Sequence, residues 1–333
     1  MIKERIISLL AGFENGNTER TFPLDYCLPI YHCVSDDNLP HLNRIIRYKN
    51  VRQFEEDLDY LSKCFQFVSW DEFKDYVKGK FRPQKKIVLL TFDDGFREFY
   101  DVVAPVLERK GIYAVNFVNP GFIDNQDLMF RCKASLIINE LDKKTDVNPE
   151  FYNILQSQNE SQEKIRKKIL GISYLKKEIL ERLAESLELD FTLFLKEQKP
   201  YLSLKQLRIL TQKGFGISAH SWDHPLYHEL PTEQQLETTN RSIRYLKENG
   251  FHGDSFAFPF TDFGVSKAFF DELFRNREIL CTFGGAGIKL DSVERNFQRI
   301  PMETGESAET LLKKEIAYFR FKKLFNKNRI VRK

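Results

Sequence analysis

Short apolar runs alternate with amphipathic segments through the first third of the chain, over residues 28–118. The run 88–92 consists mainly of Val, Leu and Phe, which suits a strand buried on both faces, as in a parallel sheet. Segments 51–63 and 70–78 repeat apolar residues at helical spacing, and 96–110 reads as a further helix. This alternation of strand and helix is typical of a parallel sheet or a barrel.

The same alternation returns after residue 200. The predicted helices there are 203–213, 232–249, 265–276 and 307–319, and the predicted strands are 215–220, 255–260, 279–283 and 297–302. With the earlier strands 28–34, 67–68, 88–93 and 112–118, they predict one α/β fold with a mostly parallel sheet. At 333 residues and 42% hydrophobic residues, the chain is long enough for one large domain with an insertion.

Residues 124–200 interrupt this pattern. Asn, Gln, Lys and Glu dominate there, and Ile165, Ile169, Ile172 and Leu175 recur at helical spacing. We interpret the segment as a helical insertion between two barrel strands, with a solvated polar face. A lid or a partner contact is the alternative, because long insertions are often functional. The predicted organisation is a helical lead-in over 1–26, a barrel over 27–123 and 201–303, the insertion over 124–200, and a C-terminal helix with a basic tail over 304–333.

The composition indicates which compartment and which partners to expect for this protein. The five cysteines form no CxxC pair, which indicates reduced, mostly buried thiols and a cytoplasmic protein. No apolar run approaches the ~20 residues of a membrane span, and the charged start does not resemble a signal peptide. The net charge of +3 gives no reason to expect nucleic acid. We expect the basic tail to be a solvated charged end, with weak contact to an anionic membrane surface as the alternative. The oligomeric state is not predicted.

Two adjacent carboxylates, Asp93 and Asp94, end the apolar run and precede Gly95. They fall at the C-terminal end of a predicted strand, where α/β folds keep their catalytic groups. Because neighbouring carboxylates repel each other, a nearby cation would explain the pair. The alternative is a helix cap, in which an aspartate accepts free N–H groups of the following helix.

Histidines follow two other strands. His220 and His224 are four residues apart, so both imidazoles can converge if the segment turns after its strand. Two neutral imidazoles with one carboxylate suit zinc or another divalent ion and leave positions open for water and substrate. His32, alone, would be a hydrogen-bonded buried residue, but beside a hydrolytic site it is a candidate general acid. Trp222, between the two histidines, is either a wall of a substrate site or a packing residue.

Four of these stretches carry a family resemblance. Thr-Phe-Asp-Asp-Gly at 91–95 and His-Ser-x-x-His at 220–224 resemble the first two motifs of the polysaccharide deacetylases, the NodB-homology or carbohydrate esterase family 4 enzymes. The stretch 256–260 is similar to their third motif. Leu-x-Ile-x-His at 28–32 resembles a motif usually found near the C-terminus of the domain, and its early position is similar to circularly permuted poly-N-acetylglucosamine deacetylases. The resemblance covers about 26–123 and 203–303, and implies a distorted (β/α) barrel of the NodB-homology type with a helical insertion.

The resemblance also implies roles for six residues and one cofactor. Asp93 would be the general base and His32 the acid that protonates the leaving amine, while the backbone N–H of Phe260 would join the oxyanion hole. Asp94, His220 and His224 would bind one divalent metal ion, zinc first, with cobalt, nickel, iron or manganese as alternatives. Our own candidates for substrate contacts are Trp222, Pro259 and Arg299.

Two positions depart from the family pattern. Ala257 stands where many members have the arginine that orients the base, and no Asp-x-x-Asp-Trp motif is evident. Arg299, on the last strand, is one replacement for that arginine; a surface or phosphate-binding residue is the other interpretation. We expect a metal-dependent hydrolase that removes acetyl groups from an N-acetylated, or less favoured O-acetylated, carbohydrate carried on a nucleotide or a lipid. The alternatives are a catalytically degenerate glycan-binding member and a hydrolase of another non-peptide C–N bond.

Overall fold

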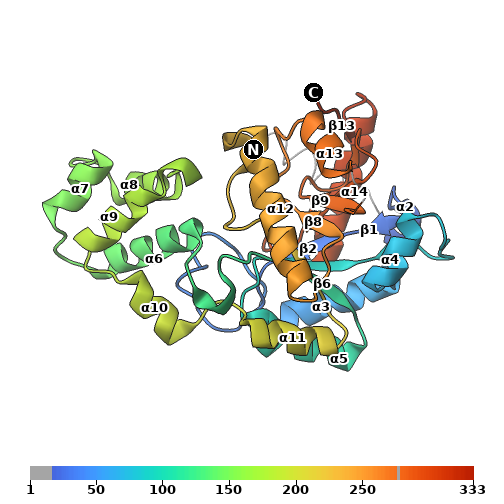
Figure 1. Cartoon of the computed structure of the whole chain (residues 1–333), viewed down its shortest axis with the longest axis horizontal. Coiled ribbons are helices and arrows are strands. Elements are labelled where there is room, and N and C mark those ends of the chain that lie inside the picture. Colours follow the sequence, from blue (N-terminus) through green and yellow to red (C-terminus); the bar gives the residue numbers. More distant parts are fainter. Residues whose placement is uncertain (1–16, 276–277) are drawn as a thin grey trace.

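A parallel sheet that curls into a nearly closed barrel forms the centre of the molecule (Figure 1). The computed structural model describes residues 17–275 and 278–333. In spatial order the strands are β11 (Asn296–Gln298), β9 (Cys281–Gly284), β8 (Ser255–Ala257), β7 (Gly216–Ala219), β6 (Ala114–Val118), β5 (Leu90–Asp93), β2 (Pro29–Tyr31) and β12 (Ile300–Pro301). Every pairing in this sheet is parallel, and the predicted distorted (β/α) barrel is confirmed.

One short segment closes the barrel. β11 pairs with β9 and β12 pairs with β2, and only Arg299 separates these two strands. The N–H of Arg299 donates to the carbonyl of Gly284 at 3.1 Å, and the N–H of Ile300 donates to Leu28 at 2.8 Å. The chain therefore changes partners at Arg299, so this side chain starts at the point where the two edges of the sheet meet.

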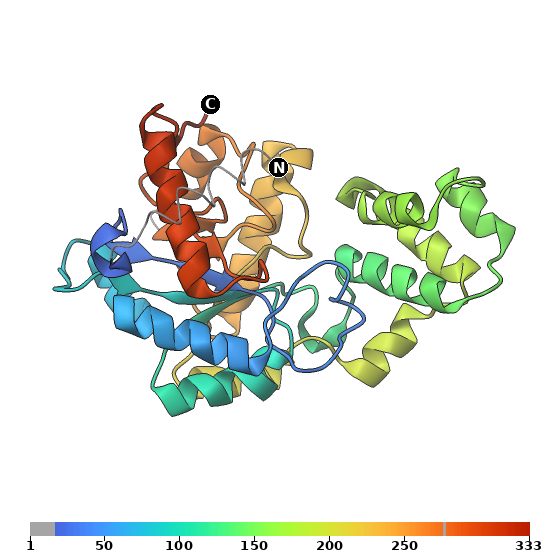
Figure 2. The same cartoon turned by 180° about the vertical axis from the view of Figure 1, so that it is seen from behind.

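Helices surround the barrel, as Figures 1 and 2 show. They are α3 (Val51–Cys64), α4 (Trp70–Val77), α5 (Ala104–Lys110), α11 (Leu204–Gln212), α12 (Thr232–Glu248), α13 (Lys267–Leu273) and α14 (Ala308–Lys323). Reciprocal capping boxes start α3, α4 and α11 and satisfy free N–H groups of their first turns. The helix predicted from residue 96 begins later, with the π-helical turn η1 (Phe99–Val103), because Asp94 and Gly95 both adopt positive φ angles.

A second, smaller parallel sheet lies at the start of two barrel strands. Its order is β1 (Tyr26–Cys27), β4 (Ile87–Val88) and β3 (Gln66–Phe67). One residue separates β1 from β2, and one separates β4 from β5. Leu89, Phe117 and Phe283 belong to the same buried cluster as Val68, Trp70 and Phe73, so this sheet and α4 are packed onto the barrel strands.

The chain between β6 and β7 forms a helical lobe beside the barrel (left in Figure 1, right in Figure 2). Its helices are α6 (Phe130–Lys143), α7 (Pro149–Leu155), α8 (Gln162–Leu170), α9 (Glu178–Ser186) and α10 (Phe191–Gln198). Ile165, Ile169 and Ile172 are buried in a cluster of their own, as their spacing predicts, whereas Leu175 is 58% exposed. The rings of Phe96, Phe122 and Tyr201 stack at the junction with the barrel and join this second core to it.

The C-terminal tail corrects one prediction. Residues after α14 form β13 (Arg329–Ile330), which pairs in parallel with β10 (Leu290–Asp291). The side chain of Arg332 is 2% exposed and forms ion pairs with Asp262 and Asp291. The expectation of a fully solvated charged end is therefore wrong for Arg332, because two buried carboxylates require a cation beside them.

Other expectations concern the start of the chain, the thiols and the membrane. Most of the predicted lead-in, residues 1–16, lies outside the described residues, and α2 (Thr18–Thr21) follows it. All five cysteines are buried and free. Within 17–275 and 278–333, no helix is both long and apolar enough to cross a membrane.

Candidate metal and catalytic site

The C-terminal ends of the barrel strands bring the predicted site residues together. β2 leads to His32, β5 ends at Asp93 and is followed by Asp94, and β7 leads to His220. Because the strands are parallel, their C-terminal ends share one rim of the barrel. His224 reaches the same rim through the turn that follows His220, and Arg299 reaches it from the closing segment.

Asp94, His220 and His224 form a buried cluster of potential metal ligands. One ligand atom from each residue lies within 4.8 Å of the others. Asp94 Oδ1 is 3.1 Å from His224 Nε2 and 3.4 Å from His220 Nε2. Among the described residues, neither Asp94 Oδ1 nor His220 Nε2 has a well-formed hydrogen bond. Unpartnered buried acceptors are costly, and a cation between them would satisfy both, so these residues fit a divalent metal ion.

The protonation states of the cluster also suit a metal. Burial opposes ionisation of Asp94, but the imidazoles of His224 and His220 hold the pKa of this carboxyl well below its usual range. Burial lowers the pKa of His224 from its ordinary value. A carboxylate and a neutral imidazole are the forms of these side chains that bind metal ions.

Backbone contacts fix the orientation of His220. Its Nδ1 lies 2.9 Å from the carbonyl oxygen of Ala257, so Nδ1–H donates there and the lone pair of Nε2 faces the cluster. Asn119, which follows β6, donates through Nδ2 to the carbonyls of both His220 and Ser221. The hydroxyl of Ser221 accepts the N–H of His224 at 3.1 Å. The sequence analysis missed Asn119, whose position after a neighbouring parallel strand was the only available signal.

Asp93 forms a bidentate ion pair with Arg299. The two guanidinium nitrogens lie 2.7 Å from Oδ1 and 2.7 Å from Oδ2 of the carboxylate. The side chains are 1% and 2% exposed, so Arg299 is neither a surface residue nor open to a substrate. Although burial opposes ionisation, Arg299 and then His220 lower the pKa of Asp93. Arg299 thus orients Asp93 and keeps this carboxyl ionised.

His32 pairs with Glu303, which the sequence analysis missed. His32 Nδ1 lies 2.5 Å from Glu303 Oε2, and Glu303 Oε1 accepts the N–H groups of His32 and Cys33 at 3.0 and 2.9 Å. Burial lowers the pKa of His32, but the Glu303 carboxylate outweighs it and raises the pKa to about 9. The His32 side chain is 27% exposed, so it can reach a ligand. Glu303 follows β12, the neighbour of β2, and that pairing was its only signal in the sequence.

The sequence matches the profile described as Polysaccharide deacetylase over residues 80–266, which is more than half of the chain. The chain belongs to the polysaccharide deacetylase family. It is therefore a carbohydrate deacetylase-like hydrolase of carbon–nitrogen bonds other than peptide bonds. A sequence comparison with curated proteins found no match.

Solved structures of other deacetylases share the fold. IcaB from Ammonifex degensii has a TM-score of 0.55 at 18% identity, over 87% of this chain and 97% of that chain. The Streptococcus pyogenes deacetylase PplD in complex with acetate has a TM-score of 0.54 at 17% identity, over 87% and 97% of the two chains. A de-N-acetylase from Aggregatibacter actinomycetemcomitans has a TM-score of 0.52 at 16% identity, over 86% and 99%.

The remaining predicted site residues, Phe260, Pro259 and Trp222, differ in their surroundings and in how far they are buried. The ring of Phe260 packs edge-on against His224, with centroids 4.3 Å apart, and its backbone adopts a φ of +55°. Within the described chain, the N–H of Phe260 has no acceptor. Pro259 is buried. The indole of Trp222 packs under Arg241 and against Tyr245, both of α12, which favours the packing interpretation over a wall facing the substrate.

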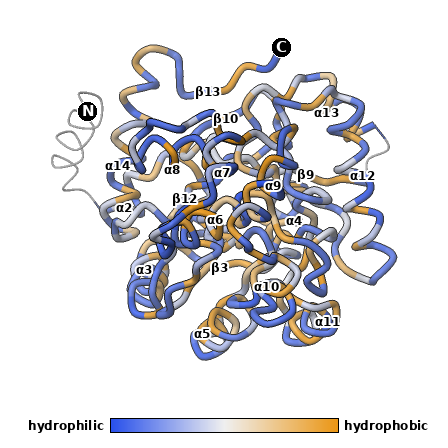
Figure 3. Tube along the Cα trace, turned by 90° about the vertical axis from the view of Figure 1, so that its left-hand side faces the viewer, coloured by the Kyte–Doolittle hydropathy of each residue, from blue (hydrophilic) through white to orange (hydrophobic). Residues whose placement is uncertain are grey.

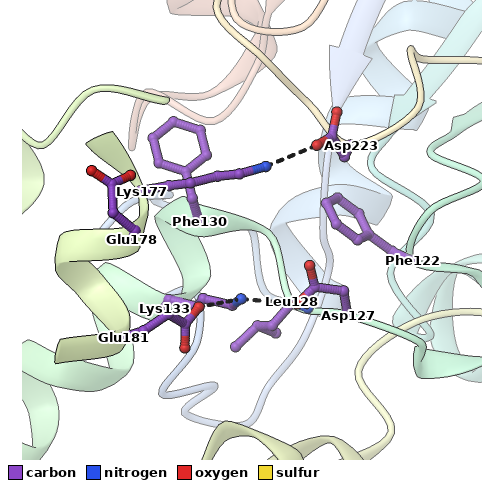
Figure 4. Close-up of a pocket in the computed structure, with 9 residues that line it drawn as sticks. All are labelled: Phe122, Asp127, Leu128, Phe130, Lys133, Lys177, Glu178, Glu181 and Asp223. Carbon is purple, nitrogen blue, oxygen red and sulfur yellow. Dashed lines mark hydrogen bonds and ion pairs between the residues drawn. The ribbon is translucent and has the colours of Figure 1, made fainter. Parts of the chain in front are cut away.

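A cavity of about 290 Å³ lies between the loop 220–224, which carries His220 and His224, and the helical lobe (Figure 4). Asp223, next to His224, accepts hydrogen bonds from Tyr174 at 2.6 Å and Lys177 at 2.9 Å. Phe130 lines the cavity, and its ring lies 6.0 Å from that of Phe260. The lobe therefore supplies one wall of a cavity beside the site. Our interpretation of its polar face as solvated did not predict this wall.

Proposed function

We propose that this chain removes acetyl groups from an N-acetylated carbohydrate, using one divalent metal ion held by Asp94, His220 and His224. Zinc is the first choice, because a site of two imidazoles and a carboxylate is common for it. The observation that carries the proposal is the buried cluster of Asp94, His220 and His224, in which Asp94 Oδ1 and His220 Nε2 lack a partner among the described residues, beside the Asp93–Arg299 and His32–Glu303 pairs. A general base, a general acid and a cation site on one rim are the groups that amide hydrolysis needs.

The side chains divide the proton transfers between them. A divalent ion in this site would polarise the acetyl carbonyl and lower the pKa of a water towards ~7. Asp93, oriented by Arg299, accepts the proton of the attacking water. His32 donates its proton to the nitrogen of the leaving amine, and Glu303 stabilises the imidazolium that must be present beforehand. The ring of Phe260 contacts His224, and the N–H of this residue, free among the described residues, donates to the developing oxyanion, a contribution of typically ~3 kcal/mol.

We further propose a cytoplasmic enzyme that acts on a sugar carried on a nucleotide or a lipid. The five buried, unpaired cysteines support a reducing compartment. An N-acetyl sugar remains favoured over an O-acetyl sugar because His32 is protonated, and an amine leaving group needs that proton more than an alcohol does.

Acetate release from N-acetylglucosamine oligomers and lipid-linked glycans tests the proposal, with metal-free, zinc-loaded and cobalt-loaded protein. We expect release only with metal. Asp93→Asn should bind zinc in calorimetry and lose turnover, whereas Asp94→Ala should lose zinc binding. A protein that binds zinc but releases no acetate from any of these substrates would contradict the proposal. Equal loss of zinc in both variants would show that the division of roles between the two aspartates is wrong.

The alternative of a degenerate glycan-binding member rested on Ala257 and on the absent Asp-x-x-Asp-Trp motif. Arg299 beside Asp93 and Glu303 beside His32 speak against it, because the proposed base and acid each have a charged partner. Hydrolysis of another non-peptide C–N bond remains the second candidate, since the same base and acid would serve it. A panel of cyclic and linear amides, assayed for amine release beside the acetate assay, separates the two.

A further inference from the structure

Large apolar side chains are exposed together at the end of α14. Leu324 is 79% exposed, Phe325 58% and Phe321 39%. The rings of Phe321 and Phe325 contact each other edge-on, with centroids 5.2 Å apart. Single exposed apolar residues are normal on a protein surface, but grouped ones usually mark an interaction site.

The same stretch is strongly basic. Residues 320–333 contain seven lysine and arginine residues and no aspartate or glutamate. Lys322 lies beside Lys289, and burial together with this like charge lowers the pKa of Lys289. Two acids face these lysines: Glu315, which is largely buried and accepts the N–H of Ile288 at 2.9 Å, and Asp262, which is paired with Arg332. An excess of positive charge therefore surrounds the exposed apolar residues.

The tail is held in place, so it presents these side chains in a fixed arrangement. Arg332 Nη1 donates to the carbonyls of Asp262 and Val265 at 2.8 and 3.2 Å. These two carbonyls flank Phe263, which is 78% exposed, as is Val331 on the tail. Figures 1 and 2 show α13, β13 and the end of the chain at the top of the molecule, and Figure 3 shows β13, β10 and α14 on one upper side and α13 on the other.

We propose that this C-terminal surface docks onto an anionic lipid bilayer. It consists of five apolar residues, Phe263, Phe321, Leu324, Phe325 and Val331, and the cations Lys322, Lys323, Lys327 and Arg329. Aromatic and aliphatic side chains enter the boundary between headgroups and acyl chains, while lysine and arginine bind the anionic headgroups. A second copy of this surface would place like charges against one another, which disfavours self-association.

The surface also adjoins the rim of the barrel. Phe263 lies three residues after Phe260, whose ring contacts His224. A bilayer bound at Phe263 would therefore lie near the candidate metal site. The docking itself requires no hydrolysis, so it stands or falls independently of the proposed activity.

Sedimentation with vesicles tests the docking on the full chain. We expect binding to phosphatidylcholine vesicles that contain about one third phosphatidylglycerol, and weak or no binding to phosphatidylcholine alone. Raising the salt from about 0.05 M to about 0.5 M should release the protein, because the interaction is screened. The double variant Leu324→Ser/Phe325→Ser should bind roughly tenfold or more weakly, since two large apolar groups leave the interface.

A matched variant on the helical lobe controls for exposed apolar area. Leu175 and Leu193 are 58% and 51% exposed, and Leu175→Ser/Leu193→Ser should bind vesicles like the unchanged chain. Thermal unfolding establishes that both double variants are folded. Three outcomes would overturn the proposal: no preference for anionic vesicles, equal loss in both double variants, or a lipid-free dimer in sedimentation velocity that Leu324→Ser/Phe325→Ser abolishes.

Discussion

Each acid–base residue at the rim has a neighbour of opposite charge that arrives from a distant part of the chain. Asp93 and Arg299 are 206 positions apart, and His32 and Glu303 are 271 apart. The residues predicted to act directly were readable because their motifs are local: an apolar run ending in two acids, and two histidines four apart. Their partners were not readable, because only the closure of the barrel brings residues 299–303 beside β2 and β5.

Arg299→Met should destabilise the protein by about 3–5 kcal/mol, because it leaves Asp93 buried without a counter-charge. Turnover should fall as well, since the pKa of Asp93 would rise, while zinc binding persists. The double variant Asp93→Asn/Arg299→Met removes both charges and should be less destabilised than the two single variants combined. Urea unfolding of the four proteins measures this coupling, and additive free energies would contradict a direct charge interaction.

Glu303→Gln should move the alkaline limb of the pH–activity profile to lower pH. A general acid must carry its proton, and with a pKa raised to about 9, His32 keeps it through neutral pH and loses it as the pH rises further. Removing the Glu303 carboxylate removes the charge that raises this pKa, so activity should decline at a lower pH. The measurement is kcat/KM against pH for both proteins, and an alkaline limb that stays in place would exclude His32 as the titrating acid.

At the scale of elements, the spacing of apolar residues predicted which strands and helices form. It did not predict the irregular elements. The last barrel strand was predicted as one element over 297–302 but splits at Arg299, because it pairs with two different partners. β13 was not predicted at all. Its sequence is mostly polar and basic, and it is ordered by pairing with β10 and by the buried acids that Arg332 meets. Such contacts depend on tertiary structure and leave no local pattern.

Arg332→Met tests how far this tail supports the fold. We expect a loss of about 3–5 kcal/mol, because the carboxylates of Asp262 and Asp291, both nearly inaccessible, lose their cation. Arg329→Met is the control, since Arg329 is exposed and a surface change of this kind usually stays within about 0.5 kcal/mol. Denaturant midpoints for the two variants give the answer. Equal, small effects would mean that the tail is only loosely attached.

At the scale of the whole molecule, the buried residues divide into a barrel core and a separate core in the helical lobe. The sequence indicated this division, because its composition changes near residues 124 and 200. It did not indicate that Tyr174 and Lys177 of the lobe contact Asp223, in the loop between His220 and His224. Those side chains looked like part of a solvated polar face.

Two cores predict that the lobe can open without the barrel. Ile137 on α6 is fully buried in the lobe core, and Ile137→Ala should cost about 2–5 kcal/mol through lost packing and the cavity that remains. Native-state hydrogen exchange should then accelerate in α6, α8 and α9 while amides of β5, β6 and β7 keep their protection, because local opening releases only the destabilised unit. The stacked rings of Phe96, Phe122 and Tyr201 oppose this separation, since they bind the lobe to the barrel. If they dominate, exchange would accelerate equally in both parts, and the lobe would have to be regarded as one cooperative unit with the barrel.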